Sequence, residues 1–489
     1  MRITFLHAPI PLRTVDNRAS YWHHFDVRYK AVHLNVRPMR KVLFELPQWI
    51  PWLAGVLRAE GFEQLSAVEF YTDCTLLNGM DEDRIHSMLV DHPADVYLLS
   101  PMTINLPQAL RIAELAKDAH PKVITVMGGV VATPLHKQVA RHPSVDYVVR
   151  DRGEYALPEL LRALRDRRHL EHIGNLTYVT ADGRLTVVPW LYPAMPVEYI
   201  PFPQVDIFPQ ETGRDLRYIR QNYALGCPFT CDFCTIQTIG RKPSYFPIPR
   251  VMAEIEAYRR HYGSHHHVYF GDETFTLRPN LTLRLCAALR DYGNITFDCQ
   301  TRLNCLREEY LSDALSMGGC RWMEIGLESA NQHTQEALKQ HTRLSMVEQV
   351  LARLRDAGIP TCSYLIIGLP NETVNEMRHS VDYVSSLIDK GLLYASYISV
   401  FVPYPGTSMF ADPQQYGMRL HHRAFDLYNE ELPPVFDSPH ASADAVYRVF
   451  LDGVGQLAEA MAATPTLTGT LPMAISNAGS TYGEFYRGG

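Results

Sequence analysis

Three closely spaced cysteines constrain this chain more than any other feature of its sequence. Cys227, Cys231 and Cys234 form the pattern C-x3-C-x2-C, and no fourth cysteine follows nearby. Thiolates are the usual ligands of iron-sulfur clusters, and three of them leave one iron open that a fourth would close. The alternatives are three buried thiols or a zinc site, but zinc needs a fourth ligand at regular spacing, and the histidines at 265–267 lie about thirty residues further on. The spacing therefore predicts a cluster with one iron open to a substrate.

The cysteines follow a stretch that is typical of a β-strand. Residues 216–223 are aromatic and alternate in polarity, and Gly226 and Pro228 would begin a loop at the carboxyl end of that strand. Barrel enzymes carry their chemistry at this end of their strands. Six other cysteines are scattered through apolar or helical segments, and we expect them to be buried small hydrophobic residues: Cys74, Cys286, Cys299, Cys305, Cys320 and Cys362.

The cysteine motif resembles the signature of the radical S-adenosylmethionine (SAM) superfamily, including the aromatic Phe233 before the last cysteine. The resemblance implies a [4Fe-4S] cluster whose free iron is chelated by the amino and carboxylate groups of SAM. It also implies that an electron from the cluster cleaves SAM to a 5'-deoxyadenosyl radical, which takes hydrogen from an unactivated carbon of a small-molecule substrate. Such an enzyme needs an external electron donor such as flavodoxin or ferredoxin.

Composition argues against several other classes of protein. The length of 489 residues suggests two or three domains, and a net charge of −7 without a basic run argues against a nucleic-acid partner. No run of about 18 apolar residues occurs, so we expect no transmembrane helix. The apolar stretch at residues 3–6 is far shorter than the apolar core of a signal peptide. We therefore expect no signal peptide and a cytoplasmic protein. Unpaired cysteines fit the cytoplasm, because its thiols are kept reduced.

Strand-like and helix-like segments alternate through the first third of the chain. Strands are expected at 2–6, 65–70, 95–100 and 122–127, with helices at 46–62, 83–91 and 106–119. This alternation predicts an α/β domain with a doubly wound parallel sheet, which binds ligands at the carboxyl ends of its strands.

This region resembles the cobalamin-binding-type domain that precedes the radical SAM barrel in one large subfamily. The resemblance lies in residues 126–134 and 145–157. It implies a cobalamin over the carboxyl edge of the sheet, with candidate contacts at Met102, Thr103, Asn105, Gly128, Gly129 and Thr133. Two alternatives remain open. The paired glycines could serve merely to make a tight turn, and the domain could hold no cobalamin. The D-x-H-x-x-G motif with which many cobalamin proteins ligate cobalt is absent, so a bound cobalamin should have no histidine beneath the metal.

A connector separates this region from the cysteine motif. Residues 174–189 predict a hairpin, and residues 189–209 carry six prolines, which is typical of an irregular segment. We expect a cobalamin-binding-like domain at 1–170, the hairpin and Pro-rich connector at 171–212, a partial (β/α)6 radical SAM barrel at 213–410, and a small C-terminal helical region with a tail at 411–489. Within the last region, residues 441–462 predict an amphipathic helix, and the final 25 or so residues are expected to be mobile.

Polar residues recur at the ends of the predicted barrel strands. Asp272 and Glu273 follow the strand at 266–270, where the resemblance implies a contact with the SAM ammonium; the alternative is that they cap the next helix. Arg302 and Glu328 would reach the SAM carboxylate and ribose, or else pair with each other. The resemblance gives the candidate SAM contacts as Phe233, Gly271, Asp272, Glu273, Arg302, Glu328, Ser329, Ile366 and Gly368.

Three functions fit these motifs. The first is a cobalamin-dependent methyltransferase of secondary metabolism, in which the adenosyl radical removes hydrogen from an unactivated carbon and methylcobalamin supplies the methyl group. The second is a radical SAM dehydratase, cyclase or rearrangement enzyme that transfers no methyl group and acts on a sugar-like or ring substrate. The third is a non-enzymatic carrier, which would not need acidic and glycine residues at successive strand ends. We favour the first slightly, because methyl transfer is the commonest activity of this domain pair. The sequence assigns no catalytic acid or base.

Overall fold

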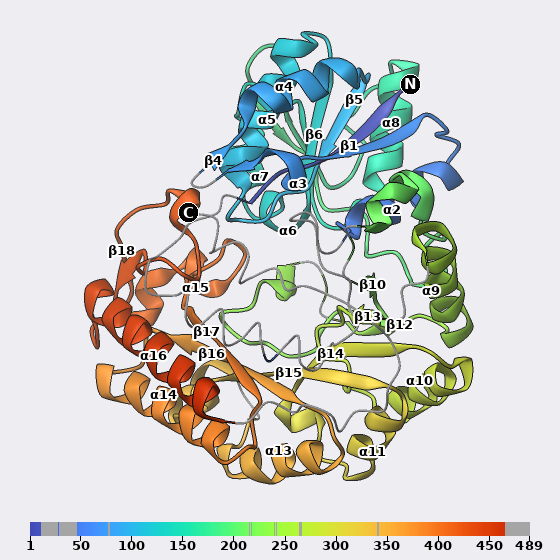
Figure 1. The fold of residues 1–489 in the computed structure, drawn as a ribbon. Coiled ribbons are helices and arrows are strands. Elements are labelled where there is room, and N and C mark those ends of the chain that lie inside the picture. Colours follow the sequence, from blue (N-terminus) through green and yellow to red (C-terminus); the bar gives the residue numbers. More distant parts are fainter. Residues whose placement is uncertain are drawn as a thin grey trace.

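The structure is a computed structural model in which the chain forms two stacked α/β domains (Figure 1). It describes residues 1–10, 28, 46–76, 79–214, 216, 218–238, 240, 242–263, 267–339 and 342–464. In Figure 1 the N-terminal domain lies above the barrel, and the C-terminal helix lies on the outside of the barrel. The tail that the sequence predicts to be mobile lies outside the described residues.

The N-terminal domain is built on a seven-stranded sheet in the order β2-β1-β5-β6-β7-β8-β9. The pairings from β2 to β7 are parallel, whereas β8 and β9 are antiparallel. The strands are β1 (Ile3–His7), β2 (Leu65–Glu69), β5 (Val96–Leu99), β6 (Ile124–Gly128), β7 (Tyr147–Val149), β8 (Leu176–Val179) and β9 (Leu185–Val187). The predicted doubly wound parallel sheet is confirmed, and the predicted hairpin, β8 and β9, extends its edge.

Helices cover both faces of this sheet. They are α2 (Trp49–Ala59), α4 (Glu82–Asp91), α5 (Leu106–Ala119) and α8 (Ala156–Asp166), with the short helices α3 (Tyr71–Cys74), α6 (Gly129–Ala132) and α7 (His136–Val139). A small hairpin, β3 (Thr75–Leu76) and β4 (Gly79–Met80), follows α3. All four residues of β5 are buried, as expected for a parallel strand covered on both sides.

The Pro-rich connector runs between the two domains. It contains two short helices, η2 (Val205–Ile207) and η3 (Gln210–Arg214). The backbone N–H of Gln204 donates to the carbonyl of Pro51 in α2, at 2.8 Å. On the barrel side, the guanidinium of Arg250 donates to the carbonyls of Ile200 and Pro201. These backbone groups of the connector therefore form hydrogen bonds with α2 and with Arg250 rather than with a neighbouring β-strand.

The second domain is a six-stranded parallel sheet in the order β10-β13-β14-β15-β16-β17. Its strands are β10 (Ile219–Gln221), β13 (His267–Phe270), β14 (Thr296–Arg302), β15 (Cys320–Glu328), β16 (Thr361–Ile367) and β17 (Ala395–Val400). The first strand is shorter than predicted, because the backbone of Tyr223 and Ala224 leaves the sheet and bonds to Asp272. The six predicted strand-helix units of the barrel are confirmed, with β10 and β17 at its open edges.

The barrel helices form an outer layer. They are α9 (Ile248–Tyr262), α10 (Pro279–Tyr292), α11 (Tyr310–Met317), α13 (Val347–Asp356) and α14 (Val374–Asp389), with shorter turns η4 (Thr235–Thr238), η5 (Leu303–Cys305), α12 (Gln332–Thr334), η6 (Gln335–Lys339) and η7 (Leu344–Met346). Helix α14 begins with a capping box formed by Thr373 and Glu376. None of the described helices is both long and apolar enough to cross a membrane.

The C-terminal helix α16 (Ala443–Ala463) completes the outer layer beside α14 (Figure 1). Gly453 lets the two elements approach closely, since a Cβ there would lie 3.0 Å from Val381 of α14 and 2.8 Å from Ile398 of β17. Before α16 the chain forms α15 (Ser408–Ala411), η8 (Pro413–Tyr416), η9 (Phe425–Leu427) and the hairpin of β18 (Arg419–Leu420) and β19 (Phe436–Asp437). The amphipathic helix predicted for residues 441–462 is confirmed.

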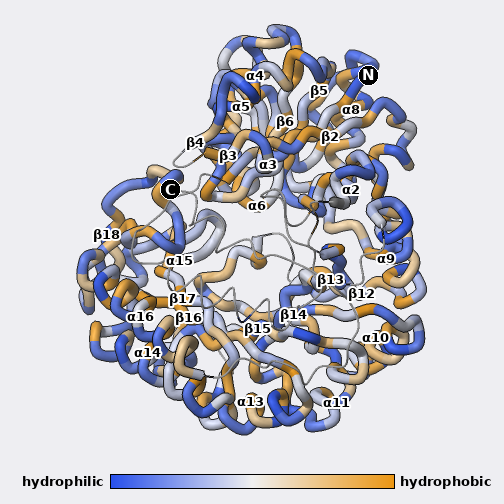
Figure 2. Tube along the Cα trace, in the orientation of Figure 1, coloured by the Kyte–Doolittle hydropathy of each residue, from blue (hydrophilic) through white to orange (hydrophobic). Residues whose placement is uncertain are grey.

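Two buried apolar clusters each contain residues of both domains, and the larger one runs through the connector. It extends from Phe5 in β1 through Phe208 in the connector to Phe246 and Leu285 in the barrel. In Figure 2 hydrophobic residues follow the strands, whereas the outer helices alternate between hydrophilic and hydrophobic residues. This shared core holds the carboxyl edge of the N-terminal sheet opposite the carboxyl edge of the barrel.

Candidate functional site

The three cysteines lie on a loop at the carboxyl end of β10, as predicted. Cys227 and Cys231 are 7% and 6% exposed, and Cys234 is half-buried. The loop is anchored by the N–H of Cys227, which donates to the carbonyl of Gly240 at 3.1 Å. Gly226 has φ +87°, and a Cβ there would lie 2.9 Å from the carbonyl oxygen of Lys242, so the turn requires glycine.

The thiols fit an iron-sulfur cluster in their chemistry. Burial raises the pKa of Cys227, and burial raises the pKa of Cys234 to about 11. Buried thiols with raised pKa values need a cation to become thiolates, and cluster irons supply that charge. No three His, Cys, Asp or Glu side chains in the described part of the chain converge on a single ion. A cubane cluster does not need such convergence, because each cysteine binds a different iron.

Asp272 and Glu273 hold the backbone that enters the cysteine loop. Asp272 is 1% exposed, and its carboxylate accepts hydrogen bonds from the N–H groups of Tyr223, at 3.0 Å, and Ala224. Glu273 accepts from the N–H of Gly226 at 3.1 Å. Burial raises the pKa of Asp272 to about 8. The alternative that these acids cap the next helix is wrong, because α10 has Arg278 at its N-cap and no side-chain cap.

The two acids differ in what they face. Asp272 lies beneath the loop, whereas Glu273 lines the cavity between the domains. Burial raises the pKa of Glu273, while backbone N–H donors, Arg152 and Arg220 oppose that rise. The contact of these acids with the SAM ammonium stays a prediction, and Glu273 is the better placed of the two.

Arg302, at the end of β14, contacts the cysteine loop directly. Its Nη1 donates to Cys231 Sγ at 2.8 Å, and its guanidinium carbon lies 4.0 Å from the centre of the Phe229 ring. Glu328 follows at the end of β15 with φ +63°, where a register shift interrupts the pairing with β16. Burial raises the pKa of Cys234, and the charge of Glu328 adds to that rise. Contacts of Arg302 and Glu328 with SAM stay predictions.

The other candidate SAM residues have different surroundings. Ser329 is buried and donates to Glu372, and Asn331 donates to the same carboxylate at 2.8 Å. Gly368 has φ +93°, and a Cβ there would lie 2.5 Å from Val446 of α16. Phe233 and Ile366 are half-buried and pack against an apolar cluster that contains residues of both domains. These residues therefore support the barrel ends whether or not they touch SAM.

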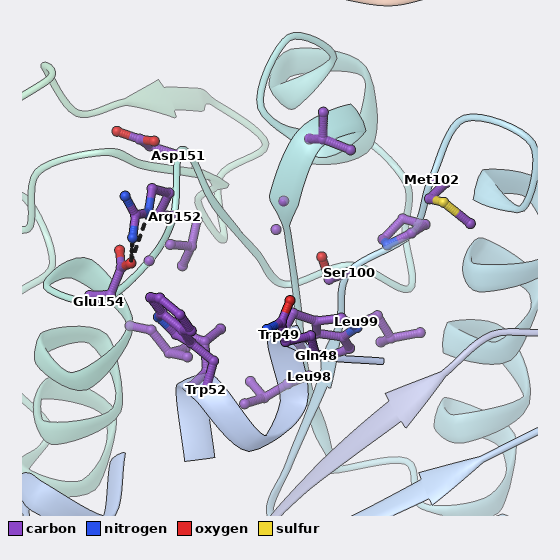
Figure 3. A pocket seen from close by; sticks show the side chains of 18 of the residues that line it. Gln48, Trp49, Trp52, Leu98, Leu99, Ser100, Met102, Asp151, Arg152 and Glu154 are labelled. Carbon is purple, nitrogen blue, oxygen red and sulfur yellow. Dashed lines mark hydrogen bonds and ion pairs between the residues drawn. The ribbon is translucent and has the colours of Figure 1, made fainter. Parts of the chain in front are cut away.

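A cavity of about 420 Å³ lies between the two domains (Figure 3). The N-terminal sheet contributes the ends of β5, β6 and β7, and α2 contributes Trp49 and Trp52. The barrel contributes Arg220 from β10, Asn222 and Leu225 from the segment between β10 and the cysteines, and Gly271 and Glu273 from the loop after β13. Figure 3 shows the two indole rings on one side and the Arg152–Glu154 ion pair, 2.9 Å long, on another. The cavity thus joins the carboxyl edges of both sheets.

Of the candidate cobalamin contacts, Met102, Gly128 and Gly129 line this cavity. Asn105 does not line it; its side chain accepts from the N–H of Met102 at 2.8 Å and donates to the carbonyl of Ala8. Thr133 donates to the carbonyl of Gly129 at 2.7 Å and accepts from the N–H of Asp151 at 2.8 Å. Thr103 is also buried away from the cavity lining. These three residues shape the loops behind the cavity.

The cavity fits a flat ring with polar groups at its edge. Gly129 has φ +88° and a Cβ there would collide with Ser100 Oγ, so the backbone forms a flat wall that only glycine allows. Asp151 has φ +67°, and its Oδ1 is buried without a hydrogen-bond partner among the described residues. Burial raises the pKa of Asp151 to about 6. The indole Nε1 of Trp49 is likewise buried without a partner. Apolar walls with a few such polar atoms suit the corrin ring and side-chain amides of cobalamin.

The barrel interior carries a polar floor that the sequence analysis missed. Tyr269 of β13 and Tyr364 of β16 both donate to Glu324 Oε2 of β15, at 3.0 and 2.6 Å. Strand β14 lies between β13 and β15, so Tyr269 and Glu324 can meet only on the concave face of the sheet. Burial raises the pKa of Glu324 to about 7. On the same face of the sheet, the side chains of Gln300, Ile366 and Ser399 are half-buried.

Two family models match the two domains. Residues 43–161 match the B12 binding domain, and residues 222–384 match the Radical SAM superfamily. The cysteine loop, Asp272, Glu273, Arg302, Glu328 and Gly368 all fall in the second match, and the paired glycines fall in the first.

The chain is also similar to several known proteins. The chain is 26% identical over 416 residues to the anaerobic magnesium-protoporphyrin IX monomethyl ester cyclase of Rubrivivax gelatinosus, covering 82% of this chain and 71% of that protein. It is 26% identical over 386 residues to the cobalamin-dependent radical SAM methyltransferase TokK of Streptomyces tokunonensis, covering 72% of this chain and 54%, about half, of TokK. The structure of the radical SAM methyltransferase TsrM from Kitasatospora setae, with cobalamin and a [4Fe-4S] cluster bound, matches with a TM-score of 0.65 at 16% identity, covering 92% of this chain and 81% of TsrM. This structural likeness establishes the fold.

Proposed function

We propose that this chain, a radical SAM protein with an N-terminal B12-binding domain, is a cobalamin-dependent methyltransferase that acts on an unactivated carbon of a small molecule. The observation that carries the proposal is the cavity between the domains. Gly128 and Gly129 line it from the B12-binding side, and Gly271 and Glu273 line it from the radical SAM side. Groups bound by the two domains would therefore meet across one shared space.

The residues of the chain have distinct tasks in this proposal. When bound, the cluster and SAM would supply a radical that takes hydrogen from the substrate, and cobalamin would supply the methyl group. Cys227, Cys231 and Cys234 would hold the cluster, and Asp272 fixes the backbone of their loop through two hydrogen bonds. Gly271 leaves room for the side chain of Arg220, because a Cβ at residue 271 would lie 2.7 Å from Arg220 Nη2. The apolar wall of Trp49 and Trp52 would exclude water from the shared space.

The substrate site in this proposal is the inner face of the barrel sheet. The floor of Glu324, Tyr269 and Tyr364 offers a carboxyl group and two phenols, and the ring of Tyr364 stacks on Tyr397 at 5.2 Å. Such a lining suits a polar molecule with hydroxyl or amino groups and a flat or cyclic part.

A second candidate is a cyclase or another radical SAM reaction without methyl transfer. It is favoured by one observation, the 26% identity over 416 residues to the cyclase of Rubrivivax gelatinosus. The same cavity and cluster loop would serve that reaction.

The products of SAM separate the two candidates. The reconstituted protein is incubated anaerobically with reductant, SAM carrying a trideuterated methyl group, and extract of the source organism. If methyl transfer occurs, the products are S-adenosylhomocysteine, 5'-deoxyadenosine and a small molecule that carries the labelled methyl group. Formation of 5'-deoxyadenosine with a substrate change but no S-adenosylhomocysteine would replace methyl transfer by the second candidate.

The proposal includes an external electron donor, such as flavodoxin or ferredoxin, because each radical formed consumes an electron. It also includes a cytoplasmic setting, since none of the nine cysteines is paired in a disulfide and unpaired cysteines persist in reducing compartments.

A further inference from the structure

The guanidinium of Arg302 is directed at a cluster ligand. Arg302 is 6% exposed, its Nη1 lies 2.8 Å from Cys231 Sγ, and its Nε lies 3.3 Å from Asn304 Oδ1. Its flat face lies over the ring of Phe229, which belongs to the same loop as Cys231, at 4.0 Å. The contacts with Cys231 and Phe229 therefore hold the buried guanidinium of Arg302 against the cysteine loop.

A hydrogen bond from a cation to a cluster ligand can change the reduction potential of the cluster. A guanidinium is charged at all working pH values and has donors in fixed directions. A donor aimed at the sulfur of a thiolate withdraws electron density from the metal that the thiolate binds. The reduction potential of an iron-sulfur cluster depends on net charge, on hydrogen bonds to its sulfurs and on exposure to solvent.

We propose that Arg302 sets the reduction potential of the cluster through its hydrogen bond to Cys231, and so acts as a positioning residue for the cluster rather than as a ligand of the SAM carboxylate. Reduction adds a negative charge to the cluster. A buried positive charge and an N–H donor at Cys231 favour the reduced form, and they therefore raise the potential. This inference requires only that the three cysteines bind the cluster, and it holds whether or not a methyl group is transferred.

The test is a redox titration of the reconstituted cluster without SAM, followed by electron paramagnetic resonance. Arg302→Gln should lower the potential, with a change of about tenfold in the reduction equilibrium constant, or about 59 mV for one electron. Arg302→Lys keeps the charge and should restore part of the shift. Arg259→Gln is the matched control, because Arg259 also lies over an aromatic ring, that of Tyr292 at 5.4 Å, but in the outer helix α9. It should leave the potential unchanged.

A second measurement needs no variant. Wild-type protein labelled with 15N-arginine should show a 15N coupling on the reduced cluster by electron-nuclear double resonance. Absence of that coupling would overturn the proposal even if Arg302→Gln failed to bind iron. The proposal would also be overturned by an Arg302→Gln protein with full iron and an unchanged potential. Weakened SAM binding in that same protein would assign Arg302 to the SAM carboxylate instead.

Discussion

Replacing Asp272 by alanine tests the role that the structure gives to the acidic pair. The change removes the acceptor for the N–H groups of Tyr223 and Ala224, both of which are buried. A buried donor left without a partner costs about 1 to 3 kcal/mol, so the two together cost roughly 2 to 6 kcal/mol. Because these groups lead into the loop that carries Cys227, we expect lower iron content as well as a lower free energy of unfolding.

The assay compares anaerobically reconstituted wild type, Asp272→Ala and a control. Iron per chain, the midpoint of urea unfolding and the affinity for SAM are measured on each protein. Asp291→Ala is the control, because Asp291 is an exposed acid paired with its neighbour Arg290, and it should behave as wild type. Our reasoning fails if Asp272→Ala keeps full iron and full stability but loses about tenfold to a hundredfold in SAM affinity, since that result would place the carboxylate on the SAM ammonium.

Three further predictions concern the cluster, the barrel floor and the C-terminal helix. Cys231→Ala should lose the cluster and all SAM cleavage, whereas Cys286→Ala should keep its iron; normal iron in Cys231→Ala would refute the ligand assignment. Burial raises the pKa of Glu324 from its ordinary value of 4.5 to about 7, so its contribution to stability is complete below pH 4.5 and is lost as the pH rises through 7. Wild type should therefore lose stability relative to Glu324→Gln between pH 5 and 8 in urea unfolding, and a difference independent of pH would contradict this. Gly368→Ala should destabilise more than Gly61→Ala, because both have positive φ but only the first would contact Val446, at 2.5 Å; equal losses in thermal unfolding would show that the contact with α16 does not matter.

Local sequence patterns predicted most of the fold. Alternating apolar strands and helices gave the doubly wound sheet and the six barrel strands, because each element there buries one face in a regular period. Helix α5 (Leu106–Ala119) has the predicted bounds, whereas β10 is shorter than predicted. The end of β10 is set by bonds to Asp272, about fifty residues later in the chain, which no local pattern contains.

The candidate site was predicted only where its residues are close in sequence. The cysteines and the paired glycines are local motifs, and the structure places both groups at strand ends. Glu324, Tyr269 and Tyr364 come from three strands and meet through the curvature of the barrel, so no spacing in the sequence indicates them. The hydrogen bonds of Asp272 to the backbone of Tyr223 and Ala224 were not predicted, for a related reason. An acid after a strand is typical of a helix cap or a cation site, and its backbone partners are visible only once the fold is known.

The position of cobalamin in the shared cavity is tested most directly by the metal content of two glycine variants. Gly129 and Gly183 both have positive φ, but a side chain at Gly129 would collide with Ser100 at the cavity wall, whereas Gly183 has no atom within 4 Å of its Cβ position. Wild type, Gly129→Val and Gly183→Val are reconstituted anaerobically with iron, sulfide and hydroxocobalamin, desalted, and analysed for cobalt and iron. We predict stoichiometric cobalt in wild type and in Gly183→Val, and loss of cobalt with full iron in Gly129→Val. Substoichiometric cobalt in a fully iron-loaded wild type, or full cobalt in Gly129→Val, would contradict the account.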